Sequence, residues 1–223
     1  GGARVAGFAC DVAKRADLQR LWDGAIATFG RVDIWVNNAG MSPDRHPIGE
    51  LDAADIRATQ ETNLLGMMHA TQIALAGMTQ QPGGGFIYNM EGFGSSGMTA
   101  AGISLYGSSK FALTYFNRCL IEETKGGPVK ICWLSPGIVV TDLLMKDMGP
   151  RGTRQWERAR RVYDILGDRV ETVTPYLAEG LLRNDRAGAR VAWLTRAKAA
   201  GRFLLARFRK RTLLTEADLQ QAG

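Results

Sequence analysis

Residues 31–40 read Arg-Val-Asp-Ile-Trp-Val-Asn-Asn-Ala-Gly. The largely apolar run 32–36 predicts a buried strand, and the polar residues 37–40 end it. Just before this stretch, apolar residues recur at helical spacing over residues 18–29 and Gly30 follows, which predicts an amphipathic helix with a glycine stop. A helix that leads directly into a buried strand is typical of a parallel sheet.

The same alternation continues on both sides of this stretch. Residues 5–10 are expected to form a short buried strand, and residues 52–81 carry mostly helix-forming side chains. Strands are expected at 86–90 and 129–134, with a helix at 106–123 between them. This order predicts an α/β fold in which helices cover both faces of a parallel sheet.

Ligands of such sheets bind beyond the carboxyl ends of the strands. The unusual residues of this sequence stand at those ends, namely Asp11, residues 38–40, residues 91–96 and residues 136–141.

The last third of the chain has a different pattern. Residues 151–166 predict a helix, and a further helix over 172–183 is expected to be entered around Pro175. No sharp shift in composition marks a second domain, so residues 1–223 are expected to form one domain. Within it, residues 151–190 are expected to cover a substrate, and residues 191–223 form a basic tail.

Composition restricts the function classes. The chain has 223 residues with a net charge of +6, which is compatible with an anionic cofactor, anionic lipid or nucleic acid. No groove-reading motif accompanies the charge, so no nucleic-acid partner is expected. The three cysteines are scattered, which suggests a reducing, cytoplasmic compartment. With these cysteines and two histidines, no metal site is expected.

Tyr106 and Lys110 are four residues apart in the expected helix 106–123 and therefore lie on one face of it. A phenol normally loses its proton near pH ~10, and a fixed ammonium beside it favours the phenolate. The pair therefore predicts an acid–base catalyst. The spacing is also common in helices that carry an ordinary surface pair, so the surrounding motifs decide its meaning.

Five motifs in one order resemble those of the short-chain dehydrogenase/reductase family. They are Asp11-Val12, Asn37-Asn38-Ala39-Gly40, Asn63 in Thr62-Asn63-Leu64, the pair Tyr106 and Lys110, and Pro136-Gly137-Ile138-Val139-Val140-Thr141. The resemblance implies a Rossmann-type doubly wound parallel sheet, a nicotinamide cofactor (NADPH or NADH), a small-molecule carbonyl substrate and a homo-oligomer.

The resemblance also implies roles for individual residues. Those implied to be catalytic are Asn63, Ser95, Tyr106 and Lys110. Those implied to bind the cofactor are Asp11, Val12, Asn38, Ala39, Gly40, Tyr106, Lys110, Pro136, Gly137, Ile138 and Thr141.

In the implied mechanism, Tyr106 donates a proton to the carbonyl oxygen and Ser95 donates a hydrogen bond to it. Lys110 lowers the pKa of Tyr106 and holds the nicotinamide ribose, and Asn63 anchors a water molecule that resupplies protons.

A narrower resemblance is to the chlorophyll(ide) b reductases. Residues 86–95, Phe-Ile-Tyr-Asn-Met-Glu-Gly-Phe-Gly-Ser, are similar to the corresponding segment of that group, as are residues 33–38, 135–145 and 213–216. This resemblance implies that the 7-formyl group of a chlorin ring is reduced to hydroxymethyl. Two other functions stay open: reduction of another aldehyde or ketone (steroid, acyl or small carbonyl), and a non-catalytic binding protein of the same fold.

Two departures from the family pattern stand out. The family's catalytic serine directly follows the fifth strand, where this chain has Glu91 and Gly92. Ser95 is therefore the candidate, with Ser96 as the alternative, and Glu91 is either an acceptor of backbone N–H groups or a residue that tunes the site.

The second departure is at the amino-terminal end, where the glycine-rich turn and the first two strands of the family are missing. Together with a first residue, Gly1, that is not methionine, this predicts a fragment of a longer protein that does not bind cofactor normally and whose targeting peptide cannot be judged.

Residues 196–211 combine seven basic residues with four large apolar ones. A basic amphipathic helix of this kind can lie on an anionic membrane, so a peripheral membrane contact stays open beside the favoured interpretation, a packed tail. A packed tail with a solvated basic face explains the same pattern.

Overall fold

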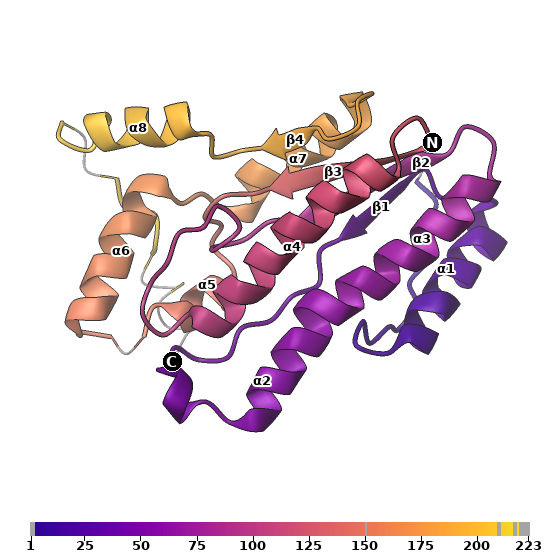
Figure 1. The fold of residues 1–223 in the computed structure, drawn as a ribbon. Helices are drawn as coiled ribbons and strands as arrows, with labels where there is room; N and C mark the ends of the chain where they lie inside the picture. Colours follow the sequence, from indigo (N-terminus) through magenta and orange to yellow (C-terminus); the bar gives the residue numbers. More distant parts are fainter. Residues whose placement is uncertain (1–2, 150, 209–210, 216–217, 219–223) are drawn as a thin grey trace.

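The computed structural model describes residues 3–149, 151–208, 211–215 and 218. Four strands form one parallel sheet in the order β1 (Ile34–Asn37), β2 (Gly85–Met90), β3 (Val129–Ser135) and β4 (Arg190–Ala192) (Figure 1). The helices are α1 (Arg15–Phe29), α2 (Ala53–Gln60), α3 (Met67–Gln80), α4 (Ser104–Glu123), α5 (Asp142–Asp147), α6 (Arg154–Leu166), α7 (Val170–Arg183) and α8 (Arg196–Leu205). A 3₁₀ turn, η1 (Ile48–Glu50), precedes α2, and a π-helical segment, η2 (Glu61–Gly66), joins α2 to α3.

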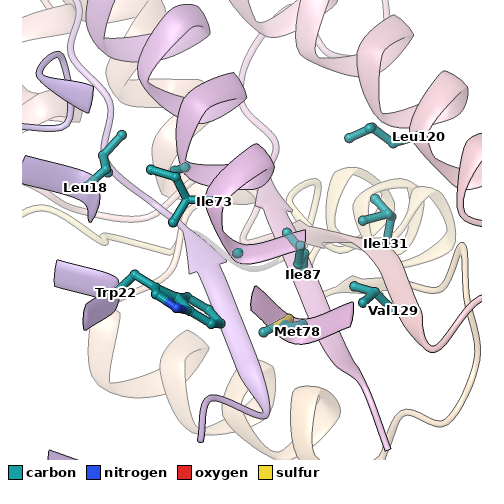
Figure 2. Close-up of a cluster of buried hydrophobic side chains, with 10 residues drawn as sticks. Leu18, Trp22, Ile73, Met78, Ile87, Leu120, Val129 and Ile131 are labelled. Carbon is teal, nitrogen blue, oxygen red and sulfur yellow. The ribbon is translucent and has the colours of Figure 1, made fainter. Parts of the chain in front are cut away.

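Successive side chains of a strand point to opposite faces of the sheet. In this fold, other elements cover both of these faces. Ile87 and Ile131 point toward α1, α3 and α4, where they join the core cluster shown in Figure 2. Tyr88 and Cys132 point to the other face, where Val173 and other side chains of α7 cover them. Burial on both sides explains why β2 and β3 read as continuous apolar runs.

The helices on the first face pack closely against one another. Trp22 of α1 lies against Gly77 of α3, where a Cβ atom would collide with the indole ring. Trp22 and Met78 are both buried in the cluster of Figure 2. Burying each such side chain stabilises the fold by roughly 1.5–3 kcal/mol.

The predicted α/β architecture with a parallel Rossmann-type sheet is confirmed, but the predicted strand at residues 5–10 is wrong. Residues 3–11 have no regular secondary structure, and Val5 is 89% exposed. Among the described strands, β1 has β2 as its one neighbour, so nothing pairs with this segment. It lies instead along α1, where Arg4 donates a hydrogen bond to the Thr28 carbonyl oxygen.

The carboxyl-terminal third holds elements that the sequence pattern did not predict. The three residues of β4 are too few for a recognisable alternation, and α5 is a six-residue helix capped by the Thr141 hydroxyl, which accepts from the Leu144 N–H. The helix α7 begins at Val170, five residues before the expected entry at Pro175.

The predicted basic tail is helical over α8, which packs on α6 (Figure 1). Arg209, Lys210 and Glu216 of that tail, and Gly1, lie outside the described residues. Among the described helices, none has the length and hydropathy needed to cross a bilayer.

Candidate active site

The site lies beyond the carboxyl ends of β1, β2 and β3, where the loops that follow these strands meet the start of α4 (Figure 1). A row of buried amides fixes the strands just below it. Asn37 of β1 donates a hydrogen bond to Asn89 of β2 over 2.7 Å. Asn89 donates in turn to Asn117 of α4, which donates to the Cys132 carbonyl oxygen of β3. The strands therefore present their ends to the site in a fixed arrangement.

Tyr106 and Lys110 lie one turn apart on α4, as the spacing predicts. The Lys110 ammonium is 5.8 Å from the centre of the Tyr106 ring. The Tyr106 hydroxyl contacts Gly92, and a Cβ atom at Gly92 would collide with that oxygen. The position just after β2, where the sequence departs from the family pattern, therefore faces the phenol.

Lys110 is almost completely buried, with 4% of its surface exposed. Burial disfavours the charged form and lowers the pKa of Lys110 to about 8. Its Nζ donates one hydrogen bond among the described residues, to the Met90 carbonyl oxygen at 3.1 Å. An ammonium has three N–H donors, so two of them have no hydrogen-bond partner among the described residues.

Asn63 lies in the π-helical segment η2 and holds the loop that follows β1. Its side-chain oxygen accepts a hydrogen bond from the Met41 N–H, and its side-chain nitrogen donates to the Met41 carbonyl oxygen, both over 2.8 Å. It also donates to Ser109 of α4. The amide thus bridges the loop, η2 and α4, whereas the water-anchoring role stays a prediction.

Ser95 is buried and bonded to backbone on two sides. Its hydroxyl oxygen accepts from the Gly92 N–H at 3.1 Å and donates to the Lys110 carbonyl oxygen at 3.4 Å. Ser96 is exposed. Ser95 therefore closes the turn 92–95 whose glycine faces Tyr106, and its own contact with a substrate stays a prediction.

The predicted cofactor residues come together in two groups. Val12, Asn38 and Ala39 line one cavity of about 80 Å³. Gly66 of η2 allows the Val12 backbone to lie this close to η2, because a Cβ atom on Gly66 would lie 2.7 Å from the Val12 carbonyl oxygen. Asp11, which precedes Val12, is exposed and forms an ion pair with Lys14 at 3.2 Å.

Gly40 follows the residues that line this cavity and lies next to Lys110. A Cβ atom there would stand 3.5 Å from the Asn63 side-chain oxygen and 3.8 Å from the Lys110 nitrogen. The Gly40 backbone therefore lies close to both the Asn63 amide and the Lys110 ammonium. Buried N–H donors beside a backbone glycine suit the hydroxyl groups of a ribose, so the chemistry of this part of the site fits a nicotinamide nucleotide.

The second group is the loop 136–141 after β3. Gly137 has a φ of +76°, which favours glycine, and a side chain there would meet Leu194 at 2.5 Å. Pro136 and Ile138 are half-buried on either side of it. Thr141 ends the loop as the cap of α5.

Two carboxylates, the buried Asp168 and the largely buried Glu91, support these loops, and the sequence did not identify their partners. Asp168 accepts hydrogen bonds from Trp193, Arg202 and Arg211. Glu91 pairs with Arg190, rather than with the backbone N–H groups that were one expectation. No periodicity or motif marks these pairs, since the partners are between 25 and 99 residues apart.

The chain is similar in sequence and in fold to known proteins. The family model described as short chain dehydrogenase matches residues 2–150. A probable chloroplastic chlorophyll(ide) b reductase of Arabidopsis thaliana is 33% identical over 193 residues, which are 86% of this chain and 38% of the relative. A D-threitol dehydrogenase of Mycolicibacterium smegmatis is 38% identical over 160 residues, which are 68% of this chain and 58% of the relative.

The chain thus spans between about two fifths and three fifths of the length of these relatives.

Among solved structures, a blue fluorescent protein from a metagenomic library, in complex with NADPH, has a TM-score of 0.65 and 25% identity. The match covers 82% of this chain and 72% of that one.

Proposed function

Since the short chain dehydrogenase model matches residues 2–150, the chain belongs to that family, and we propose that the protein that carries it is a nicotinamide-dependent carbonyl reductase. The observation that carries the proposal is the pairing on α4 of Tyr106 with the buried Lys110, next to the backbone of Gly40. Burying an ammonium costs free energy. Buried ionisable groups with shifted pKa values are concentrated at sites that bind a ligand or transfer a proton.

The reduced cofactor, when bound, supplies a hydride to the carbonyl carbon. Tyr106 donates a proton to the carbonyl oxygen as negative charge develops there. Lys110 holds ribose hydroxyls with its two remaining N–H donors and keeps a positive charge near the phenol. Ser95 either contacts the carbonyl oxygen or fixes the turn 92–95, and Asn63 orders the loop that ends at Met41.

The cofactor is NADPH or NADH. Val12, Asn38 and Ala39 would bind its adenosine half, with Asp11 at the adenine. Residues 136–141 would bind the nicotinamide end. These residues follow three different segments that meet at one edge of the sheet, which is where dinucleotides bind in such folds.

The substrate we propose is the 7-formyl group of chlorophyll(ide) b, supported by the similarity to the Arabidopsis reductase over 86% of the chain. Residues 151–190, which include α6 and α7, would cover the pigment. The alternative substrate is another aldehyde or ketone. The 38% identity to a D-threitol dehydrogenase supports this alternative. A non-catalytic binding protein is disfavoured because Tyr106 and Lys110 are both present and adjacent.

Replacing Tyr106 by Phe tests the proposal. Losing a general acid costs about 10²–10⁴-fold in rate, so Tyr106→Phe in the protein that carries this chain should nearly abolish reduction and leave cofactor binding unchanged. Reduction of chlorophyllide b and of small aldehydes is followed by NADPH absorbance, and binding by NADPH fluorescence. Tyr115→Phe is the control, since Tyr115 is on the same helix and 71% exposed.

Retention of most of the activity in Tyr106→Phe would reject the proton-donor role. Binding of NADPH without turnover of any carbonyl in the wild-type protein would instead favour the non-catalytic alternative.

Two partner contacts accompany the proposal. The protein would form a homo-oligomer through the helices that carry Asn63 and Tyr106, whose outer faces expose Leu65 and Phe111. It would also touch anionic membrane through α8 and the residues that follow it, where Leu204 and Phe208 are exposed. The expected cytoplasmic location, peripheral to a membrane, stays a prediction.

A further inference from the structure

Glu91 occupies the first position after β2, directly before the glycine that faces Tyr106. Its side chain is 11% exposed. Arg190, at the start of β4, donates to one Glu91 carboxylate oxygen through Nε at 2.8 Å and contacts the same oxygen through a terminal nitrogen at 2.7 Å. The Arg190 side chain is 51% exposed, but Glu91 is largely buried and accepts two short contacts, so the pair is better fixed than one with both partners exposed.

Arg190 also reaches the second loop of the site. The terminal nitrogen that contacts Glu91 donates to the Ser135 hydroxyl at 3.1 Å. Ser135 is the last residue of β3, immediately before the loop 136–141. One guanidinium therefore joins the ends of β2 and β3, from which the two loops of the site begin.

The backbone adds a third connection. The Glu91 N–H donates to the Leu134 carbonyl oxygen at 2.8 Å. Gly92, the next residue, contacts the Tyr106 hydroxyl, so a tilt of Glu91 moves the surface on which the phenol rests.

We infer that Glu91 is a positioning residue: through Arg190 it holds the turn 92–95 against Tyr106 and in register with the loop 136–141. The inference rests on the proposed function. It assigns a role to the position at which this chain departs from the family's serine, and to a strand, β4, that lies outside the matched residues 2–150.

Kinetics of the protein that carries this chain provide the first test. Displacing a catalytic group by about 1 Å costs up to 10²-fold, so we expect Glu91→Ala to lower kcat about 10-fold or more while the KM for NADPH changes far less. Glu91→Gln, which keeps the shape and one acceptor, should lose less. The double variant Glu91→Arg/Arg190→Glu should recover part of the loss, because it restores the pair with reversed charges.

The matched control is Asp33→Asn, which breaks an exposed ion pair with Arg31 just before β1, at the end of the sheet opposite the site. It should leave kcat unchanged. A loss of activity in Glu91→Ala that the reversed pair does not recover, or an equal loss in the control, would overturn the inference.

Amide hydrogen exchange gives a readout that needs no substrate. Glu91→Ala should speed exchange in the peptide that covers residues 91–97 and leave the peptide that covers α1 unchanged. If the wild-type protein reduces no carbonyl, the proposed function fails, and exchange still decides the role of Glu91. Unchanged exchange in residues 91–97 would show that the ion pair does not position the turn.

Discussion

Gly92 sets the position of the proposed proton donor. No side chain fits between its backbone and the Tyr106 hydroxyl, and the Cα hydrogen is the largest group that the contact allows. A side chain at this position would push the phenol away, so the observed position of Tyr106 requires a glycine here. The role of Ser95 as the serine that acts on the substrate stays a prediction.

Replacement of Gly92 by Ala should therefore lower kcat strongly. The added methyl group displaces the Tyr106 hydroxyl, and misplacement of a reacting group by about 1 Å costs up to 10²-fold. The measurement is steady-state reduction with the protein that carries this chain, together with its melting temperature.

Gly107→Ala is the control for that substitution. Gly107 is next to Tyr106 in α4, and a Cβ atom there would meet nothing within 4 Å beyond its own helix and chain neighbours. Activity in Gly92→Ala as high as in Gly107→Ala would show that Tyr106 is not held by this contact.

At the scale of the elements, Asp168 joins the cofactor loop to the carboxyl-terminal segment. Its backbone pairs with both sides of Val139, donating to the Ile138 carbonyl oxygen and accepting from the Val140 N–H. Its carboxylate, 3% exposed, binds Arg202 of α8 and Arg211. The loop 136–141 and α8 are therefore held by one residue located between α6 and α7.

Burial by itself raises the pKa of Asp168, but hydrogen bonds from Arg202, Trp193 and Arg211 outweigh it and hold that pKa below the usual range. A carboxylate with a lowered folded-state pKa stabilises the protein above the unfolded-state pKa of about 3.9. That stability is lost as the pH falls from about 4 through the folded-state value.

Asp168→Asn should reduce the free energy of unfolding at pH 7 by about 3 kcal/mol, because it leaves two arginines facing a neutral amide. The difference from wild type should shrink at pH values below about 4, where the carboxylate of the wild type becomes protonated. Urea unfolding at several pH values measures both effects. A loss that is independent of pH would contradict the assigned ionic role.

At the scale of the whole molecule, the outer face of α8 and the residues after it is apolar and basic together. Phe203, Leu204, Leu205 and Phe208 are between 50% and 86% exposed. Arg202 and Arg211 point inward to Asp168, while Arg196 and Arg207 are exposed. The inner side of this segment is therefore a packed tail, as one interpretation of the sequence expected. The outer side has the composition of a membrane-binding surface, and its contact with a membrane stays a prediction.

Vesicle flotation tests the outer side. The protein should bind vesicles that contain phosphatidylserine more strongly than neutral vesicles, and less at high salt, because the charges are screened. Leu204→Glu/Leu205→Glu should abolish binding, whereas Leu182→Glu on α7, also an exposed leucine, should not. Equal binding by wild type and the double variant would reject the membrane contact.

Much of the fold follows from contiguous patterns. The helix 18–29, the strands around residues 32–36, 86–90 and 129–134 and the helix of Tyr106 were predicted to within a few residues. Helical and strand periodicities are properties of neighbouring residues, so a single sequence carries them. The spacing of Tyr106 and Lys110 on one helical face is of the same kind.

The sequence by itself therefore determined the alternation of strands and helices, the family, and the placement of Tyr106 and Lys110 on one face of a helix. The tertiary structure alone decided that residues 5–10 are no strand, that Gly92 faces the phenol, and that Glu91 pairs with Arg190 across 99 residues. A strand exists only where a neighbour accepts its hydrogen bonds, and a buried charge chooses its partner in space. Neither condition can be predicted from the pattern of adjacent residues.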